Sequence, residues 1–262
     1  MKKYIISSLA LVTLFTSTTI FAYDLEDNYI GGSNPNDVIG ARSTFDIKGL
    51  DASLLGTTLT VDIYTNFAGK ADNGVYPSLT QTEASGWGNG IGYGDLFLAD
   101  DDVKDGWEYG FSLDNRWSAT GGTADLYAVS GSLLANAAPA DYLLSDSFIS
   151  SGTYRNDKEV AVNTNGPYSS ATLVSSGSWS VNESTGSLRF SVDLSGTGLP
   201  YSRQGIRIGW GETCANDLIQ GTVSMDTLTD KATSVPEPAA LALVGLGLFG
   251  TIINRRRTKP ST

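Results

Sequence analysis

The chain has 262 residues, a formal net charge of −11, a single cysteine and no histidine. Without histidine, Ser-His-Asp and Cys-His catalysis and histidine-based metal sites are excluded. With Cys214 alone, an internal disulfide is excluded as well. The acidic balance argues against nucleic acid as a partner.

The first 22 residues have the pattern of a secretion signal. Lys2 and Lys3 form a charged start, an apolar stretch follows, and Ala22 ends a region suited to cleavage. A segment of this kind directs export and is then removed. We therefore predict a signal peptide over residues 1–22 and an exported body that begins at Tyr23.

The body, residues 23–234, is long enough for one substantial hydrophobic core, and no linker divides it. The signal and the C-terminal tail together carry a net charge of about +5, so the body alone carries about −16. A charge of this sign favours solubility and neutral or cationic partners. We predict one domain over residues 23–234.

Short runs of alternating apolar and polar residues recur along the body. The clearest runs cover residues 59–64, 109–113, 188–194, 206–210 and 223–225, and weaker ones cover 45–47, 96–98, 126–129, 160–162 and 179–181. Alternation with a period of two is typical of strands with one buried face, and Gly- and Asn-rich turns separate the runs. No sustained helical period occurs before the tail. The pattern predicts an all-β fold, a single β-sandwich of jelly-roll-like form.

A glycine-rich stretch over residues 86–94 contains Trp87 and Tyr93. It matches neither the dinucleotide fingerprint nor a phosphate-binding loop. One interpretation is a flexible loop in which the two aromatic residues are anchors. The other is an aromatic platform that Trp87 and Tyr93 present to a sugar ring. Trp107 lies two residues before the predicted strand 109–113, and its parity predicts an inward-facing side chain.

Carboxylates gather in the window that follows: Asp95, Asp100, Asp101, Asp102, Asp105 and Glu108. Two facing carboxyls would suit glycoside hydrolysis, but the Glu-x-Asp-x-x-Glu pattern of sandwich glycosidases is absent. Calcium prefers several oxygen ligands in a turn, so the window suits Ca²⁺ better, with Asp100, Asp102 and Asp105 as candidate ligands. A solvated acidic loop is the alternative, and Lys104 would oppose a cation.

The C-terminal tail, residues 235–262, has three parts in a fixed order. A proline-rich box comes first, an apolar run over residues 239–253 second, and a basic cluster last: Val235, Pro236, Glu237 and Pro238, then Arg255, Arg256 and Arg257. The apolar run is short against the ~20 residues of a typical membrane helix, but the flanking side chains extend it. Cationic flanks stay in the cytoplasm, which places the body outside it.

This tail resembles the PEP-CTERM sorting signal of Gram-negative bacteria, which has the same three parts. The resemblance implies an exosortase as partner, a membrane protease-transpeptidase that cuts near the Pro-Glu-Pro box. It also implies an inner-membrane intermediate, held by residues 239–253, and later delivery to the cell surface or outside the cell.

A weaker resemblance lies at the end of the body. The phrase from Cys214 to Gly221 is similar to a final-strand motif of exported bacterial β-sandwich proteins with this tail, which usually has Gly where Ala215 stands. It implies one sandwich over nearly the whole body and no particular reaction.

The sequence therefore predicts a non-enzymatic, exported protein of the cell surface or extracellular matrix. Weak carbohydrate binding, with exopolysaccharide as the partner, is the leading molecular expectation. The alternative is a secreted glycoside hydrolase or another polysaccharide-acting enzyme.

Overall fold

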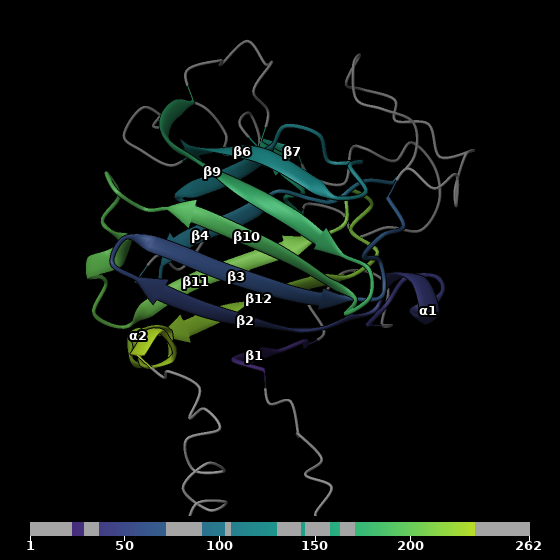
Figure 1. Cartoon of the computed structure of the whole chain (residues 1–262), viewed down its shortest axis with the longest axis horizontal. Helices are drawn as coiled ribbons and strands as arrows, with labels where there is room; N and C mark the ends of the chain where they lie inside the picture. Colours follow the sequence, from purple (N-terminus) through teal and green to yellow (C-terminus); the bar gives the residue numbers. More distant parts are fainter. Residues whose placement is uncertain are drawn as a thin grey trace, which may run out of the picture.

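The computed structural model describes most of the body (Figure 1). The described residues are 23–28, 37–71, 91–102, 106–129, 143–144, 158–162 and 171–233. Their elements in chain order are β1 (Leu25–Glu26), α1 (Arg42–Phe45), β2 (Ile47–Leu55), β3 (Thr58–Thr65), β4 (Leu96–Asp100), β5 (Tyr109–Leu113), β6 (Gly121–Ala128), β7 (Leu143–Leu144), β8 (Ala161–Val162), β9 (Thr172–Asn182), β10 (Ser187–Asp193), a 3₁₀ turn (Leu199–Tyr201), β11 (Gly205–Gly211), β12 (Leu218–Ser224) and α2 (Met225–Thr233).

Ten strands form one antiparallel sheet in the order β1-β2-β3-β10-β9-β6-β5-β4-β11-β12, and β7 pairs separately with β8. The sheet folds over on itself, so that β2, β3 and β10 form one layer and β4, β11 and β12 lie behind it (Figure 1). The two ends of the sheet approach each other: Leu25 of β1 packs against Gly221 of β12, and α2 packs on β2. The result is nearly a closed barrel.

The all-β prediction is confirmed, but the jelly-roll-like sandwich takes a different form. Instead of two separate sheets, the two layers belong to one continuous sheet. Consecutive strands β4, β5 and β6 are neighbours, and β3 pairs with β10. Near closure removes most of the exposed sheet edge, which is a physical reason for this arrangement.

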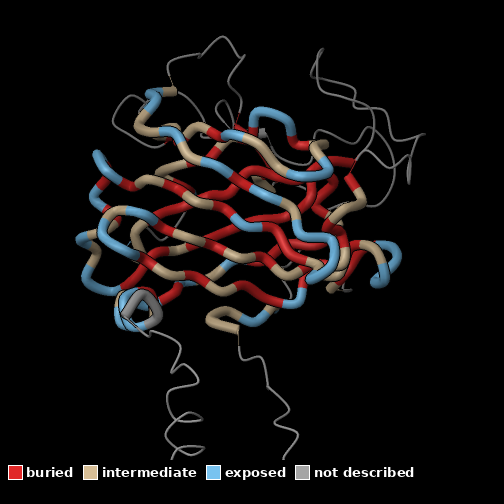
Figure 2. The backbone as a smooth tube through the Cα atoms, viewed as in Figure 1, coloured by how far each residue is buried: buried red, intermediate tan, exposed pale blue. Residues whose placement is uncertain are grey.

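The alternating runs of the sequence form the core (Figure 2). In β3, Leu59, Val61 and Ile63 are completely buried, whereas the residues between them are partly exposed. Each of the three lies directly opposite a buried residue of β10 in the register of the pair. One face of β3 and one face of β10 are therefore buried, which confirms the period-two prediction for these two strands.

Both helices are missing from the sequence-based prediction. Phe45, predicted in a strand, lies in the short α1, and Met225, predicted in a strand, begins α2. The Ser224 side chain caps α2 by accepting a hydrogen bond from the Thr227 N–H (3.2 Å). Leu228 is fully buried, but most other residues of α2 are polar, so its helical period is weak in the sequence.

A second hydrophobic cluster lies on the other face of β4. Leu96 and Leu98 point into the main core, while Phe97 and Ala99 point the opposite way. The predicted inward orientation of Trp107 is wrong: the side chain is buried, but it packs in this outer cluster and not in the main core. Trp107 also lies so close to β11 that a side chain at position 209 would clash with it, which explains glycine there.

No helix within the described residues is long and apolar enough to cross a membrane. The predicted signal peptide, residues 1–22, and the predicted span, residues 239–253, lie outside the described residues.

A buried ion pair ties several elements of the sheet together. Asp95, just before β4, has a carboxylate with no exposed surface, and one oxygen accepts hydrogen bonds from the Leu113 N–H and from Arg116, both at 3.0 Å. The other oxygen accepts from the Val162 N–H at 2.7 Å. Arg116 also donates to the Tyr93 carbonyl (3.0 Å). Burial raises the pKa of the Asp95 carboxyl, while Arg116 and the two N–H groups oppose that rise.

Removing one partner of this pair should be costly. We expect Asp95→Asn to lower the free energy of unfolding by about 3–5 kcal/mol, because Arg116 then stays buried without its counter-charge. Asp62→Asn is the matched control. It breaks a pair in which the Arg189 side chain is 62% exposed, so the expected loss is at most about 1 kcal/mol. Urea unfolding of the purified variants measures both, and equal losses would contradict the role of Asp95.

Candidate functional site

Several predicted site residues lie outside the described residues. These are the whole sorting tail, including Val235, Pro236, Glu237, Pro238, Arg255, Arg256 and Arg257, as well as Trp87 and Asp105. The processing role of the tail and a sugar contact at Trp87 therefore stay predictions.

Tyr93 does not present its ring to a ligand in the structure, so its assignment as a glycan contact is wrong. The residue is completely buried, and its ring packs edge-on against Phe67 and Trp179, with centroids 5.5 and 5.4 Å away. Its hydroxyl accepts a hydrogen bond from the Gly69 N–H (2.8 Å). Burial raises the pKa of Tyr93. The sequence could not separate this core tyrosine from a loop platform, because it stands among glycines.

The acidic turn after β4 directs its carboxylates toward nearby donors. Asp100 accepts hydrogen bonds from the Asp102 N–H (3.2 Å) and the Ser202 hydroxyl (3.3 Å). Asp102 accepts from the side chain of Gln204 (3.0 Å). The two carboxylates thus have separate protein partners, and calcium binding by Asp100, Asp102 and Asp105 stays a prediction.

A groove of about 530 Å³ lies on the outer face of the front layer, across β2, β3, β10 and β9. The strands that carry it run side by side in Figure 1. Its described lining is polar and aromatic: Tyr23, Lys48, Asp62, Tyr64, Ser180, Asn182, Thr185, Ser187 and Arg189. The volume falls within the range of small-molecule sites, ~300–1,000 Å³.

The register of the sheet arranges the groove in two rows. Asp62 of β3 lies opposite Arg189 of β10, which lies opposite Ser180 of β9. The second row lies two residues away on each strand. There, Tyr64 lies opposite Ser187, and Ser187 lies opposite Asn182. Residues two apart on a strand point to the same face, so both rows share the outer surface.

The first row contains a well-oriented ion pair. The Arg189 Nε donates to Asp62 Oδ1 at 2.7 Å and its Nη2 donates to Asp62 Oδ2 at 2.8 Å. The Asp62 hydrogen bonds raise the pKa of Arg189 further above its usual value. A two-point Arg–carboxylate contact of this kind fixes both groups in one plane. The Arg189 side chain remains 62% exposed and the Asp62 side chain 18% exposed, so the pair reaches the groove surface mainly through the guanidinium.

Two tyrosines form the aromatic side of the groove. The rings of Tyr23 and Tyr64 lie 5.1 Å apart at an angle of 41°. The Tyr64 hydroxyl donates to Asp51 (3.2 Å). Burial, followed by the negative charges of Asp51 and Asp62, raises the pKa of Tyr64 to about 12. Tyr64 therefore stays protonated at physiological pH and keeps the proton that it donates to Asp51.

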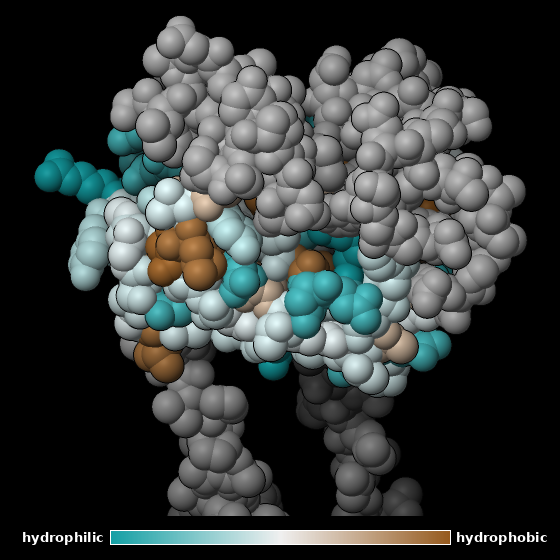
Figure 3. All heavy atoms as spheres, turned by 90° about the horizontal axis from the view of Figure 1, so that it is seen from above, coloured by the Kyte–Doolittle hydropathy of each residue, from teal (hydrophilic) through white to brown (hydrophobic). Residues whose placement is uncertain are grey.

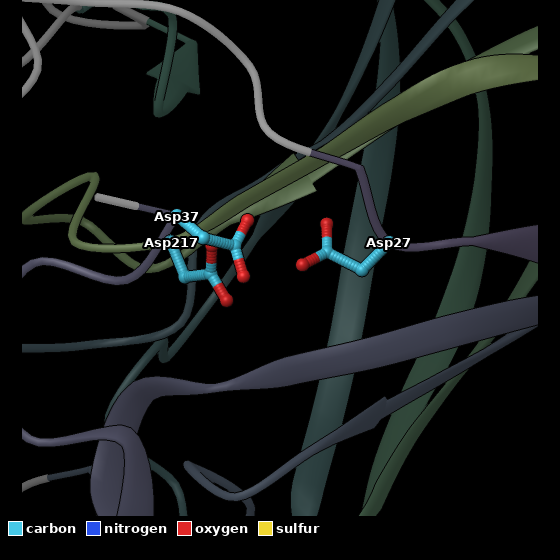
Figure 4. A group of neighbouring side chains, drawn as sticks. All are labelled: Asp27, Asp37 and Asp217. Atoms are coloured by element: carbon cyan, nitrogen blue, oxygen red, sulfur yellow. The ribbon is translucent and has the colours of Figure 1, made fainter. Parts of the chain in front are cut away.

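A cluster of three carboxylates lies elsewhere, where the segment after β1 meets the loop before β12 (Figure 4). Single oxygens of Asp27, Asp37 and Asp217 all lie within 4.8 Å of one another, a spacing at which they could hold a cation. Asp217 is buried and accepts hydrogen bonds from the N–H groups of Ile47 (2.7 Å) and Leu218 (3.0 Å). Asp37 pairs with the exposed Arg42 (3.1 Å). Asp217 thus has a clear structural role, since it fixes the start of β2.

The loop before β12 also explains a detail of the sequence. Ala215 has a φ of +50°, in the left-handed region that glycine adopts without strain. The final-strand motif that this loop resembles usually has glycine at that position. The physical reason is therefore this backbone conformation, which Ala215 adopts at some cost in energy.

Sequence reasoning missed the groove, although each of its strand residues lies at an outward position. Alternation identifies outward residues, but it does not say which strands are neighbours. Asp62 and Arg189 are 127 positions apart. The sequence did contain one signal. Two of the clearest predicted strands, 59–64 and 188–194, carry opposite charges at outward positions, Asp62 and Arg189.

Truncation of Asp217 tests its structural role. We expect Asp217→Ala to lower the free energy of unfolding by about 2–6 kcal/mol, because two buried N–H groups lose their acceptor, at about 1–3 kcal/mol each. Asp37→Ala, in the same cluster, should cost at most about 1 kcal/mol, because Asp37 pairs with Arg42, whose side chain is 66% exposed. Thermal unfolding compares the two. A larger loss for Asp37→Ala would show that the cluster, and not the N–H contacts, is the stabilising feature.

Comparison with known proteins adds one finding, and it concerns the tail. Residues 234–257 match the PEP-CTERM protein-sorting motif. No curated protein and no solved structure matches the chain. The motif covers the proline-rich box, the apolar run and the basic cluster in the predicted order. The C-terminal tail is therefore a PEP-CTERM protein-sorting motif, which implies sorting by an exosortase.

Proposed function

We propose that this chain is an exported component of the cell surface or extracellular matrix, and that its body acts by binding carbohydrate and not by catalysis. The observation that carries the sorting part of the proposal is the match of residues 234–257 to the protein-sorting motif. Export begins with the signal peptide, residues 1–22. The tail then holds the chain in the inner membrane until an exosortase cuts near the Pro-Glu-Pro box.

The chemistry of the tail supports this route. A short apolar run holds the chain in the bilayer, and Arg255, Arg256 and Arg257 keep its end in the cytoplasm. Pro236 and Pro238 disfavour helix and keep the box extended, as a protease requires of its substrate. Retention and cutting thus rest on different residues, which allows them to be tested separately.

The groove supports binding over hydrolysis. It combines two tyrosine rings with a fixed ion pair and several hydroxyl and amide groups. Among its described lining residues, Asp62 is the one carboxylate. Glycoside hydrolysis in its usual form needs two facing carboxyls. We therefore favour a binding module over the alternative, a secreted glycoside hydrolase.

The described surface supports a polysaccharide partner more than an extended protein interface. Figure 3 shows hydrophobic residues in small separate patches among hydrophilic ones on the visible part of the described surface. Within the described residues, the exposed large hydrophobic side chains are Leu55, Leu173 and Tyr201, and they lie on separate elements. Contiguous apolar patches of several hundred Å² usually mark protein or membrane contacts.

Deletion of the tail tests the sorting route. In a cell that has an exosortase, we expect removal of residues 235–262 to release a folded body into the periplasm or the medium. The full chain should instead pass through the inner membrane to the surface. Cell fractionation with immunoblotting measures both. A truncated body that still fractionates with the inner membrane would contradict the anchoring role.

A second variant separates cutting from retention. Replacing both Pro236 and Pro238 with Ala keeps the apolar run and the arginines, so the chain should still reach the inner membrane. We expect it to accumulate there uncut, at the size of the precursor. Normal processing of this variant would show that the box is not the feature recognised by the exosortase.

A further inference from the structure

We propose that the groove across β2, β3, β10 and β9 binds pyranose rings of a polysaccharide, with Tyr23 and Tyr64 as the stacking side and the Asp62–Arg189 pair as the hydroxyl-binding side. The inference rests on the proposed function and names its site and ligand class. It replaces the predicted sugar contact at Tyr93, which is buried.

The aromatic side is preorganised. The C–H faces of a pyranose ring are apolar and pack on an aromatic ring, so fixed tyrosines at a groove are suitable partners. Tyr23 lies directly over Gly49 of β2, where any Cβ would come within 2.5 Å of the ring. The Tyr64 ring is fixed by its hydrogen bond to Asp51. Rings that are already ordered lose little conformational entropy when a ligand binds.

Tyr23 is held in place by the residue that follows it. The Asp24 N–H donates to the Leu50 carbonyl (3.0 Å), and the Asp24 carboxylate accepts from the Ala52 N–H (2.8 Å). If the signal peptide is cut after Ala22, Tyr23 becomes the first residue of the exported chain. The contacts of Tyr23 and Asp24 given above, among the described residues, come from residues that remain after the cut.

The polar side offers donors and acceptors together. Each sugar hydroxyl donates one hydrogen bond and accepts others. The guanidinium of Arg189 supplies donors and the carboxylate of Asp62 supplies acceptors, and their mutual contacts hold them in one plane. Adjacent hydroxyls of a pyranose present the same alternation of donor and acceptor. Asn182, whose amide oxygen accepts from Ser184 and from the Thr185 N–H, extends this polar side.

The local charge differs from that of the body. Lys48 and Arg189 against Asp62 give the described lining a net positive charge of one, whereas the whole body carries about −16. An acidic polysaccharide would be repelled by most of this protein but not by the groove, and a neutral one would fit as well. Acidic and neutral polysaccharides both contain pyranose rings with adjacent hydroxyls, and the experiment below distinguishes the two kinds.

Affinity electrophoresis of the full chain, purified in mild non-ionic detergent, tests the proposal. Native gels contain hydroxyethylcellulose as a neutral probe, alginate as a uronate probe, or no polysaccharide. We expect at least one probe to retard the chain. Retardation by hydroxyethylcellulose identifies neutral rings, retardation by alginate identifies uronates, and retardation by both identifies the shared ring chemistry.

Two variants place the binding in the groove. Tyr23→Ala and Arg189→Met should each raise the dissociation constant derived from retardation by about tenfold. Tyr23→Phe should bind as the parent does. The controls change the same residue types elsewhere. Tyr201→Ala alters a tyrosine that is 81% exposed, and Arg42→Met alters another exposed arginine paired with aspartate. Both controls should bind as the parent does.

Two results would overturn the proposal, and they differ in what else they affect. If the parent is retarded but Tyr23→Ala and Arg189→Met migrate as it does, the groove is not the site, and carbohydrate binding by the body survives. If neither probe retards the parent, both the groove and carbohydrate binding fail. The sorting route is judged separately by fractionation. Circular dichroism of each variant confirms that altered migration does not reflect loss of the fold.

Discussion

The carboxylate of Asp95 is the group on which much of the described structure depends. It accepts hydrogen bonds from β5 and β8 and pairs with Arg116, which in turn holds the Tyr93 carbonyl. A charge in the interior persists only when its partners are all in place, since its loss of hydration is expensive. The ion pair therefore favours the arrangement in which β5, β8 and Arg116 all meet the Asp95 carboxylate. Tyr93 extends that arrangement to the turn after β3 through its ring contact with Phe67.

The two faces of the strands have separate tasks. Inward residues of β3 and β10 close the core, and outward residues of the same strands build the groove. The sheet is hydrogen-bonded on both sides of these strands, so the outward rows are held rigidly. Asp62 and Arg189 meet because of cross-strand register alone. A binding surface built on a rigid sheet needs little reorganisation to accept a ligand.

The two functional parts of the chain rest on different kinds of physics. The proposed action of the tail rests on composition: prolines disfavour helix, an apolar run prefers lipid, and cationic flanks favour the cytoplasmic side of a membrane. These effects depend on residue type and order and not on a tertiary fold. The body works through geometry, because its groove combines side chains from Tyr23 to Arg189 that no local pattern brings together. A chain of this kind can thus be sorted by one part and bind by another.

The sequence by itself determined the all-β class, most of the strands and the identity of the sorting tail. Period-two alternation located β3, β5, β10 and β11, and residue order alone located the motif at residues 234–257. Tertiary structure decided the near-closed sheet, the helix α2 and the burial of Tyr93. It also decided the groove, because pairing between distant strands, and not the pattern within one strand, sets which outward residues are neighbours. Local periodicity fixes the face on which a residue lies, whereas long-range hydrogen bonding fixes what lies beside it.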